Sequence, residues 1–358
     1  MTVRRAWIEW RNRLLASPRF QDWALSTPIV RRIARRRAQA LFDLVAGFAY
    51  SQALAAAVRL DLPALLAEGP QNPDALAGRL GLPPDSAAVL LRAAAALGLA
   101  ERLEDGRYML GPQGAALRGT PGVAAMIAHH DLLYADLADP VAVLARGGGG
   151  GKLADFWLYG AGGDPAAVAD YSRLMAASQP LVAQQILDAW DFGRHRSVLD
   201  VGGGEGAFLA ALAARHPTLR LALFDLPAVA ERARARLGTS ATVHGGDFRT
   251  DPLPLGADLV TLVRILHDHD DGPAQALLDR IARALPPGGT LLVAEPFAAT
   301  PGAEAMGAYF GLYLLAMGSG RPRAAGEIGA MLERAGFAHW RQRRTRHPLT
   351  LGMIVATR

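Results

Sequence analysis

The hydrophobic pattern changes near residue 194, and the part of the chain after it has the clearer periodicity. Short apolar runs suited to buried strands begin there, separated by longer stretches with apolar residues at helical spacing. The predicted strands cover residues 197–201, 219–225, 241–245, 257–266 and 289–295. The predicted helices cover 208–216, 226–237, 272–285 and 326–337, and the tail can supply two more strands. Strands that alternate with helices predict an α/β fold, with helices on both faces of a mostly parallel sheet.

Before residue 194 the pattern is almost entirely helical. Residues 41–66 are so apolar that their helices must pack in a core or a subunit interface. Residues 72–118 have the order helix, turn, helix and hairpin, which is typical of a winged helix. We therefore expect four parts. They are a basic segment over 1–40, a winged-helix dimerisation domain over 41–120, a helical linker and pocket region over 121–190, and the α/β domain over 191–358.

The composition fits a folded protein of two or three domains, because the chain has 358 residues, of which 51% are hydrophobic and 20% charged. Cysteine is absent, which excludes disulfides, thiolate metal sites and a cysteine nucleophile, and is compatible with a cytoplasmic location. No uninterrupted apolar run reaches the roughly 18 residues of a membrane-spanning helix. The N-terminus also lacks the continuous apolar stretch of a secretory signal.

Basic residues concentrate in the first 40 positions, where the many arginines are accompanied by only two acids, Glu9 and Asp22. Trp7, Trp10 and Trp23 are interleaved with them. A basic, aromatic helical stretch suits peripheral binding to an anionic membrane surface. It suits equally well a helix that embraces a partner subunit, so both interpretations stay open.

A glycine-rich turn follows the strand that ends at Val201 and precedes a helix. Its glycines are Gly202, Gly203, Gly204 and Gly206. Without Cβ atoms the backbone can approach a ligand closely, and the helix N-terminus behind it suits a carboxylate. Asp200 can face a cationic amino group, and Asp225, at the end of the next strand, suits two ribose hydroxyls. The turn alone fits a methyltransferase or a dehydrogenase, because it also meets the loose dinucleotide fingerprint.

Three further features favour a methyltransferase. The turn follows a long helical region instead of opening the chain. Residues 246–248, Gly-Asp-Phe, follow the third strand and place an acid and an aromatic ring where they can hold an adenine. The fourth strand leads to His267, at the carboxyl edge of the sheet, where α/β proteins bind ligands. Three acids follow, which we expect to cap the next helix and not to hold a metal: Asp268, Asp270 and Asp271.

Five motifs, LDVGGGEG, FDLP, GGDF, ILHDHDD and LLVAEPF, have an order and spacing that resemble those of the small-molecule O-methyltransferases. That family includes the caffeic acid and acetylserotonin enzymes, and the resemblance covers roughly residues 45–340. It implies S-adenosylmethionine as the cofactor, with no metal required. It also implies a Rossmann-like, seven-stranded sheet with one reversed strand, and an intertwined homodimer built through the N-terminal domain.

The resemblance assigns the catalytic base to His267 and the acid that orients it to Glu295. A histidine suits this role, because its ordinary pKa of about 6.5 leaves it unprotonated near neutral pH. The expected cofactor-binding residues are Asp200, Gly202, Gly204, Asp225, Leu226, Gly246, Asp247, Phe248 and Arg264. Two positions depart from the plant members. Val263 stands where a lysine is common, and Pro322 stands where a second orienting acid is expected, with Glu327 as a candidate substitute.

Residues 34–66 are similar in particular to the bacterial carotenoid branch of this family, the hydroxyneurosporene or demethylspheroidene O-methyltransferases. This similarity implies an apolar acceptor, an acyclic carotenoid with a tertiary 1-hydroxyl group. A quinone, a polyketide phenol or a bacteriochlorophyll precursor stays open as the acceptor, as does transfer to carbon. The expected location is the cytoplasm, with the membrane surface as the place where such an acceptor would be collected.

Other patterns have weaker functional interpretations. A winged helix could bind DNA, but the candidate recognition helix over 85–99 has only Arg92 as a basic residue, so we expect no nucleic-acid partner. Residues 146–152 imitate a phosphate loop but lack its first glycine and its final Ser or Thr. His129 and His130 are neighbours on a helix, so a shared role in one pocket is not expected. Four residues recur at helical spacing and fit either a buried stripe or a pocket wall: Tyr309, Phe310, Tyr313 and Met317.

Overall fold

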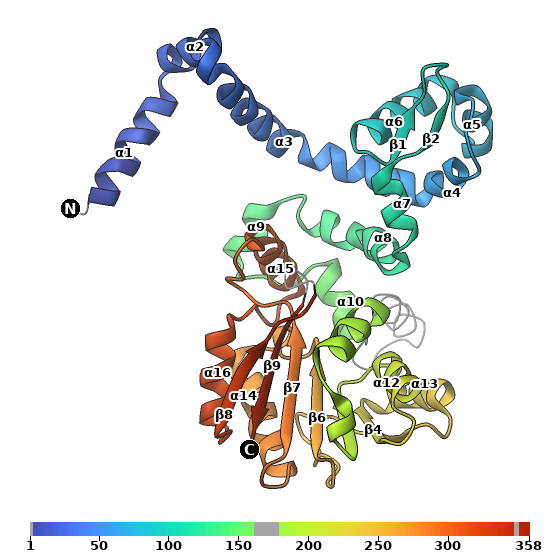
Figure 1. Cartoon of the computed structure of the whole chain (residues 1–358), viewed down its shortest axis with the longest axis vertical. Coiled ribbons are helices and arrows are strands. Elements are labelled where there is room, and N and C mark those ends of the chain that lie inside the picture. The colour runs from blue at the N-terminus through green and yellow to red at the C-terminus, as the bar shows by residue number, and fades with distance from the viewer. Residues whose placement is uncertain (1–2, 161–178, 347–350) are drawn as a thin grey trace. The chain divides into compact units, whose positions relative to one another are not determined.

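The computed structural model describes residues 3–160, 179–346 and 351–358, and the chain divides into two compact units. The units are Met1–Gly119 and Thr120–Arg358. In the first, one two-stranded hairpin accompanies the helices (Figure 1). Its elements are α1 (Val3–Ala16), α2 (Pro18–Ser26), α3 (Pro28–Arg59), α4 (Leu62–Ala67), α5 (Pro73–Leu80), α6 (Pro84–Ala96), β1 (Ala100–Arg102), β2 (Tyr108–Leu110) and α7 (Pro112–Arg118).

The expected helix, turn, helix and hairpin are confirmed in this unit. The Asn72 side chain accepts a hydrogen bond from the Asp74 N–H and caps α5, which begins at Pro73. The helix ends at Gly81, whose left-handed φ of 67° suits a helix C-terminus. β1 and β2 pair antiparallel around the predicted turn, and leucines of α4, α5 and α6 form a buried core beside them.

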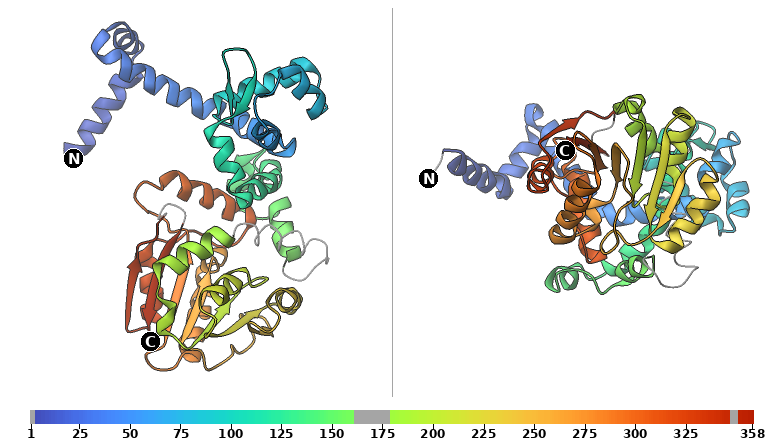
Figure 2. Two further views of the ribbon diagram at one scale, coloured as in Figure 1. Left: turned by 45° about the vertical axis from the view of Figure 1, so that its right-hand side comes forward. Right: turned by 90° about the horizontal axis from the view of Figure 1, so that it is seen from below.

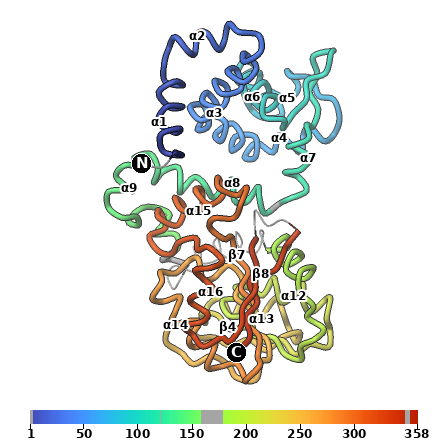
Figure 3. Tube along the Cα trace, turned by 60° about the vertical axis from the view of Figure 1, so that its left-hand side comes forward, coloured from blue at the N-terminus to red at the C-terminus, as the bar shows by residue number. Residues whose placement is uncertain are grey.

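α3 is one continuous helix of 32 residues that passes through residue 40, so the basic segment and the apolar stretch after it share an element (Figure 3). Its second half packs against α4 and α6. Leu41, Leu44 and Phe48 nevertheless stay 65%, 80% and 75% exposed. Among the described residues α3 is the one helix long and apolar enough to cross a membrane by length and composition alone. Of the two alternatives expected for residues 41–66, a core or a subunit interface, this exposed apolar surface fits the interface.

The second unit contains a seven-stranded sheet in the order β5-β4-β3-β6-β7-β9-β8. All strands are parallel except β9, which pairs antiparallel with both β7 and β8. The seven strands and the single reversed one confirm the expected fold. The strands are β3 (Ser197–Val201), β4 (Arg220–Asp225), β5 (Thr242–Gly245), β6 (Leu259–Val263), β7 (Thr290–Glu295), β8 (His339–Arg343) and β9 (Gly352–Thr357).

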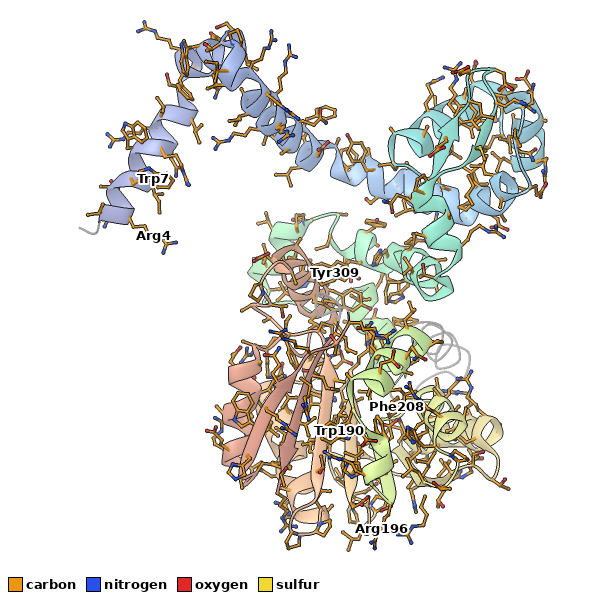
Figure 4. All side chains as sticks on the ribbon, viewed as in Figure 1. Arg4, Trp7, Trp190, Arg196, Phe208 and Tyr309 are labelled. Atoms are coloured by element: carbon orange, nitrogen blue, oxygen red, sulfur yellow. The ribbon has the colours of Figure 1, made fainter. Side chains whose placement is uncertain are left out.

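Helices cover both faces of this sheet, as Figure 2 shows in its view from below. One face is covered by helical residues 179–189, α12 (Ala207–Arg215) and α13 (Pro227–Leu237), with Trp190 and Phe208 in the buried layer (Figure 4). The other face is covered by α14 (Asp271–Ala284) and α16 (Ala325–Arg334). Both layers are apolar, and the buried acids Asp200 and Glu295 lie at the carboxyl ends of their strands.

The predicted strand over 257–266 is too long. β6 ends at Val263, because Arg264 adopts a left-handed φ of 60° that leaves the extended region. A 3-10 turn, η2 (Leu266–Asp268), follows directly. No local pattern marks this turn, because apolar residues continue past Arg264 to Leu266.

Four further helices of this unit lie near the carboxyl edge of the sheet, and three of them form a small separate core (Figure 1). They are α8 (Pro121–Asp136), α9 (Pro140–Ala145), α10 (Lys152–Gly160) and α15 (Glu304–Met317). The residues of this core come from α8, α10 and α15, and α9 packs against α15. Part of the predicted helical region, residues 161–178, lies outside the described residues. The glycine run after α9 packs on α15, since the Gly149 N–H donates to the Leu315 carbonyl at 3.0 Å. This packing gives the run a structural role unlike that of a phosphate loop.

Candidate active site

Four of the predicted site residues lie at one edge of the sheet. Asp200 and Asp225 are at the carboxyl ends of β3 and β4, His267 follows β6, and Glu295 ends β7. Because these strands are parallel neighbours, their carboxyl ends meet at the place where α/β proteins bind ligands. The structure therefore brings the glycine turn and the predicted base together.

Asp200 is a buried acid with one oxygen left for a ligand. The Thr261 hydroxyl donates to its Oδ1 at 2.7 Å, whereas Oδ2 is buried and has no partner. Burial raises the pKa of Asp200 to about 7. A buried carboxylate oxygen without a partner is costly in isolation, and an ammonium group would satisfy it. The turn after Asp200 requires glycine at position 202, because its φ is 71° and a Cβ there would lie 2.4 Å from Ile265 Cδ1.

Asp225 is held rigidly at the end of β4. The Gly204 N–H donates to its Oδ2 and the Leu226 N–H donates to its Oδ1, both at 2.7 Å. Burial raises the pKa of this carboxyl group, although the two backbone donors oppose the shift. Each oxygen keeps a lone pair beyond these bonds, so the fixed carboxylate can accept from two neighbouring hydroxyls.

The turn after β5 differs from expectation in one respect. The Gly246 N–H donates to the Asp225 carbonyl at 2.9 Å, which ties this turn to the end of β4. Asp247, however, is already paired with Arg249, whose Nη2 lies 2.7 Å from Oδ2 and lowers the pKa of the carboxyl group. The Phe248 ring meets His269 edge to face at 5.3 Å. Asp247 must therefore share its carboxylate between Arg249 and any ligand, and Phe248 is partly buried against the core.

His267 is buried between two carboxylates. Its Nδ1 lies 3.3 Å from Glu295 Oε2, and the same oxygen accepts the His267 backbone N–H at 3.2 Å. On the other side, Nε2 lies 3.1 Å from Asp268 Oδ1. Burial alone would lower the pKa of His267, but Asp268 and Glu295 outweigh it and raise the pKa above its ordinary value. This imidazole is therefore arranged to accept a proton and to hold it.

The second acid beside the base is Asp268 and not Glu327. Glu327 accepts from the Ala324 N–H and from Arg321, both at 2.8 Å, and so caps α16. The expectation that it supports the base is wrong, because both of its oxygens are engaged at the start of that helix. Asp268 was expected to cap the next helix. Its adjacency to His267 at the end of a strand was the signal available in the sequence, and the 3-10 turn makes the contact possible.

The other two acids of this segment do not cap α14 with their side chains either. Asp270 is the N-cap residue, yet its side chain makes no cap hydrogen bond and instead accepts from the Gly320 N–H at 2.9 Å. Asp271 pairs with Arg321 and Arg323. Both acids serve a contact with the segment before α16, and no cluster able to hold a metal occurs in the described part of the chain.

Arg264 lies close enough to the base to influence it. Its positive charge lowers the pKa values of His267, Tyr309 and Tyr313, in each case as a minor contribution. Its backbone N–H donates to the Ala294 carbonyl at 2.8 Å, which continues the pairing of β6 with β7 past the end of the strand. The left-handed backbone at Arg264 is thus fixed in place beside His267.

An aromatic wall from α15 stands beside the base. Phe310 meets the His267 ring edge to face at 6.2 Å, and Tyr309 packs on Phe310 at 5.2 Å. Tyr313 and Met317, further along the helix, are buried in the core with α8 and α10. The four residues at helical spacing therefore have two roles: Phe310 and Tyr309 stand beside the base, whereas Tyr313 and Met317 belong to the core.

The adjacent histidines of α8 both reach α15. His129 Nε2 lies 2.8 Å from the Tyr313 hydroxyl, and His130 Nε2 lies 2.7 Å from the Tyr309 hydroxyl. Burial lowers the pKa of both histidines, that of His129 to about 4, and raises the pKa of both tyrosines, that of Tyr309 to about 12, so both pairs are neutral near pH 7. The hydrogen bonds satisfy these polar groups within the protein, which leaves largely apolar ring surface toward the site.

Comparison with known proteins agrees with this geometry. The profile of the O-methyltransferase domain matches residues 135–338, and that of the O-methyltransferase dimerisation domain matches residues 42–118. The chain belongs to the O-methyltransferase family. It is therefore an S-adenosylmethionine-dependent O-methyltransferase, and its dimerisation domain supports a homodimer. The orphaned oxygen of Asp200 and the anchored carboxylate of Asp225 fit this cofactor's ammonium group and ribose.

Several relatives cover most of the chain. The demethylspheroidene O-methyltransferase of Cereibacter sphaeroides is 49% identical over 91% of this enzyme and 88% of its own length. That of Rhodobacter capsulatus is 43% identical over 98% and 90%. Mouse acetylserotonin O-methyltransferase is 34% identical over 87% and 86%.

Solved structures share the fold. Human N-acetylserotonin methyltransferase, in complex with S-adenosylmethionine, has a TM-score of 0.77 at 23% identity and covers 90% of this chain and 97% of its own. The mitomycin 7-O-methyltransferase has a TM-score of 0.76 at 28% identity and covers 91% and 100%.

Proposed function

We propose that this enzyme methylates the tertiary 1-hydroxyl group of an acyclic carotenoid, with His267 as the general base. Two relatives with this chain's whole architecture, at 49% and 43% identity, are demethylspheroidene O-methyltransferases, which supports a carotenoid acceptor. The observation that carries the chemistry is the position of His267 between Glu295 and Asp268, at the edge of the sheet that also carries the glycine turn.

S-adenosylmethionine, when bound, supplies an activated methyl group, so the chain must align the acceptor oxygen and remove its proton. Glu295 beside Nδ1 favours the tautomer with the proton on Nδ1, so that Nε2, which also faces Asp268, can take the proton of the acceptor hydroxyl. An alcohol is too weak an acid to lose its proton beforehand, so proton removal accompanies attack. Asp268 beside Nε2 and Glu295 beside Nδ1 then both stabilise the imidazolium that forms.

Cofactor binding is assigned to the turns after β3, β4 and β5. Asp200 would hold the ammonium group, and Asp225, with Leu226 beside it, would hold the ribose. Gly202 and Gly204 would line the methionine end. Four more residues complete this proposed set around the adenine and the reacting centre: Gly246, Asp247, Phe248 and Arg264.

A long polyene lies in the membrane, and α1 has the properties of a helix that docks there. Val3, Trp7 and Trp10 share one face of α1 and are 88%, 53% and 57% exposed. Arginines flank them, and the Arg11 guanidinium lies over the Trp7 ring at 5.0 Å (Figure 4 labels Arg4 and Trp7). Tryptophan with arginine at an apolar helix face is typical of interfacial binding to anionic lipid. We therefore propose peripheral membrane association through α1.

Sedimentation with anionic liposomes tests the membrane proposal. The wild type should pellet at low salt and be released at about 0.5 M salt, because surface charge is then screened. The double variant Trp7→Ser/Trp10→Ser should stay in the supernatant as a dimer. Leu255→Ser, which removes another exposed apolar side chain, is the control and should pellet like the wild type. Equal pelleting of all three proteins would refute docking through α1, and monomers from the double variant would assign α1 to the subunit interface.

The acceptor is tested by competition. Purified enzyme receives S-adenosylmethionine with a deuterated methyl group and an equimolar mixture of a 1-hydroxylated acyclic carotenoid, a hydroquinone and a simple phenol. Mass spectrometry should find the label on the carotenoid oxygen. Labelling of the phenol or quinone with an unlabelled carotenoid would refute the proposed acceptor and leave the O-methyltransferase assignment intact.

A further inference from the structure

Arg323, in the segment between α15 and α16, is the largest fully buried side chain among the described residues. Its Nη1 donates to the Leu266 carbonyl at 2.6 Å and its Nη2 donates to the His269 carbonyl at 2.7 Å. Nε and Nη2 also donate to Asp271 Oδ1, at 3.0 and 2.8 Å. One guanidinium therefore donates hydrogen bonds to the backbone on both sides of His267.

The same segment makes three more contacts with the turn that carries the base. The Ser319 hydroxyl donates to the Asp268 carbonyl at 3.0 Å, and the Gly320 N–H donates to Asp270 Oδ1 at 2.9 Å. Gly320 itself approaches so closely that a Cβ there would lie 2.1 Å from the His267 carbonyl oxygen, and its φ is 79°. Residues 319–323 thus bond to three backbone carbonyls of this turn and to the Asp270 side chain.

Arg323 also links this turn to the strand that carries Glu295. Its own carbonyl accepts from the Ala298 N–H at 2.9 Å, just beyond the end of β7. The imidazole and the carboxylate that orients it come from β6 and β7, so their 3.3 Å contact depends on how the turn after β6 is seated. Arg323 bonds to both segments and fixes that relation.

A buried arginine is costly unless its donors are used, and here Asp271 and two carbonyls use them. Only arginine offers a planar fork that can reach two carbonyls and a carboxylate together, whereas lysine would carry the charge at one point. Neighbouring Arg321 shares Asp271 but is 44% exposed, and its second ion pair is with Glu327. Arg321 therefore forms ion pairs, whereas Arg323 also bonds to the backbone of the turn.

We infer that Arg323 is a positioning residue for the methyl-transfer reaction, which sets the orientation of His267 against Glu295 by clamping the carbonyls of Leu266 and His269. The inference rests on the proposed role of His267 as the base. Displacement of a catalytic group by about 1 Å can cost 100-fold in rate, so a loosened turn should slow turnover without loss of substrate binding.

The test compares Arg323→Lys with Arg321→Lys, both in the full-length enzyme with S-adenosylmethionine and the carotenoid. Arg323→Lys should lower kcat by about 10- to 100-fold and leave the cofactor Kd unchanged. Since lysine keeps the charge, any change in the acidic limb of the pH–rate profile reports geometry. Burial and Arg264 lower the pKa of His267, whereas Asp268 and Glu295 raise it. A relaxed turn weakens the contacts with these two acids, so the pKa should fall. The limb should therefore move to lower pH, whereas Arg321→Lys should match the wild type.

Gly320→Ala provides a second test of the positioning role if Arg323→Lys does not fold, because the added Cβ would displace the His267 carbonyl. It should give the same loss of kcat with an unchanged cofactor Kd. His267→Ala, measured in parallel, separates the two hypotheses. If His267→Ala is inactive but Arg323→Lys keeps the wild-type kcat and pH profile, the positioning role alone is overturned. The same holds for Gly320→Ala where that variant is used. An active His267→Ala overturns the base assignment and the inference with it.

Discussion

Asp225→Asn is the substitution whose effect the structure defines most closely. The carboxylate accepts one backbone N–H on each oxygen, from Gly204 and from Leu226, both at 2.7 Å. An asparagine has only one acceptor oxygen, so one of these donors must face an amide N–H. The substitution therefore disturbs the glycine turn or the start of α13 as well as the ribose site.

Two magnitudes follow. A buried donor left without an acceptor costs about 1–3 kcal/mol, so the free energy of unfolding should fall by that amount. Loss of one charge-assisted hydrogen bond to a ribose hydroxyl costs about 1.5–3 kcal/mol, which corresponds to a roughly 10- to 100-fold higher Kd for S-adenosylmethionine. The two effects are separable because one is measured without cofactor.

Isothermal titration calorimetry with S-adenosylmethionine, together with chemical denaturation, checks both values. Asp188→Asn is the matched control, because Asp188 is paired with Arg215 in the same unit and is not one of the residues assigned to cofactor binding. It should leave the cofactor Kd unchanged. A Kd for Asp225→Asn within twofold of the wild type, in a protein that is folded, would refute the assignment of Asp225 to the ribose.

Other predictions concern protons and the acceptor. Burial raises the pKa of Asp200 to about 7, and its ionised form would hold the cofactor's ammonium group, so binding near pH 6 should release a proton and weaken as pH falls. Calorimetry in buffers of different ionisation enthalpy measures this proton release, and Asp200→Asn should abolish it. Glu295 raises the pKa of His267, and the base must be neutral to act. Glu295→Gln should therefore lower kcat and move the acidic limb of the pH–rate profile to lower pH; an unmoved limb would contradict the contact. Phe310→Ala should raise the KM for the carotenoid about tenfold, or about 1.4 kcal/mol, with the cofactor Kd unchanged; a change in the cofactor Kd instead would place the ring elsewhere.

Much of the fold follows from the sequence because its signals are local. Alternating apolar strands and amphipathic helices identify the sheet, and the order of motifs along the chain gives its reversed strand through the family resemblance. Asp225 and His267 could be found because each stands at the end of a predicted strand, where chain direction alone brings them to one edge.

The rest depends on contacts between distant segments or on backbone geometry. Arg323 lies far along the chain from the turn that it grips, and no local pattern marks an arginine as buried. The left-handed Arg264 ends β6 early, although the apolar pattern continues to Leu266. Asp268 was interpreted as a cap because the 3-10 turn that aims it at His267 was not predicted.

The most direct measurement is the single-turnover rate of methyl transfer for the wild type and His267→Ala, each loaded with S-adenosylmethionine and mixed with the 1-hydroxylated carotenoid. Removal of a general base should slow this step by about 100- to 10,000-fold. The cofactor Kd should stay unchanged, because the ring contacts Glu295, Asp268 and Phe310, none of which is assigned to cofactor binding. A His267→Ala rate within a few-fold of the wild type would contradict the role of His267 as the base.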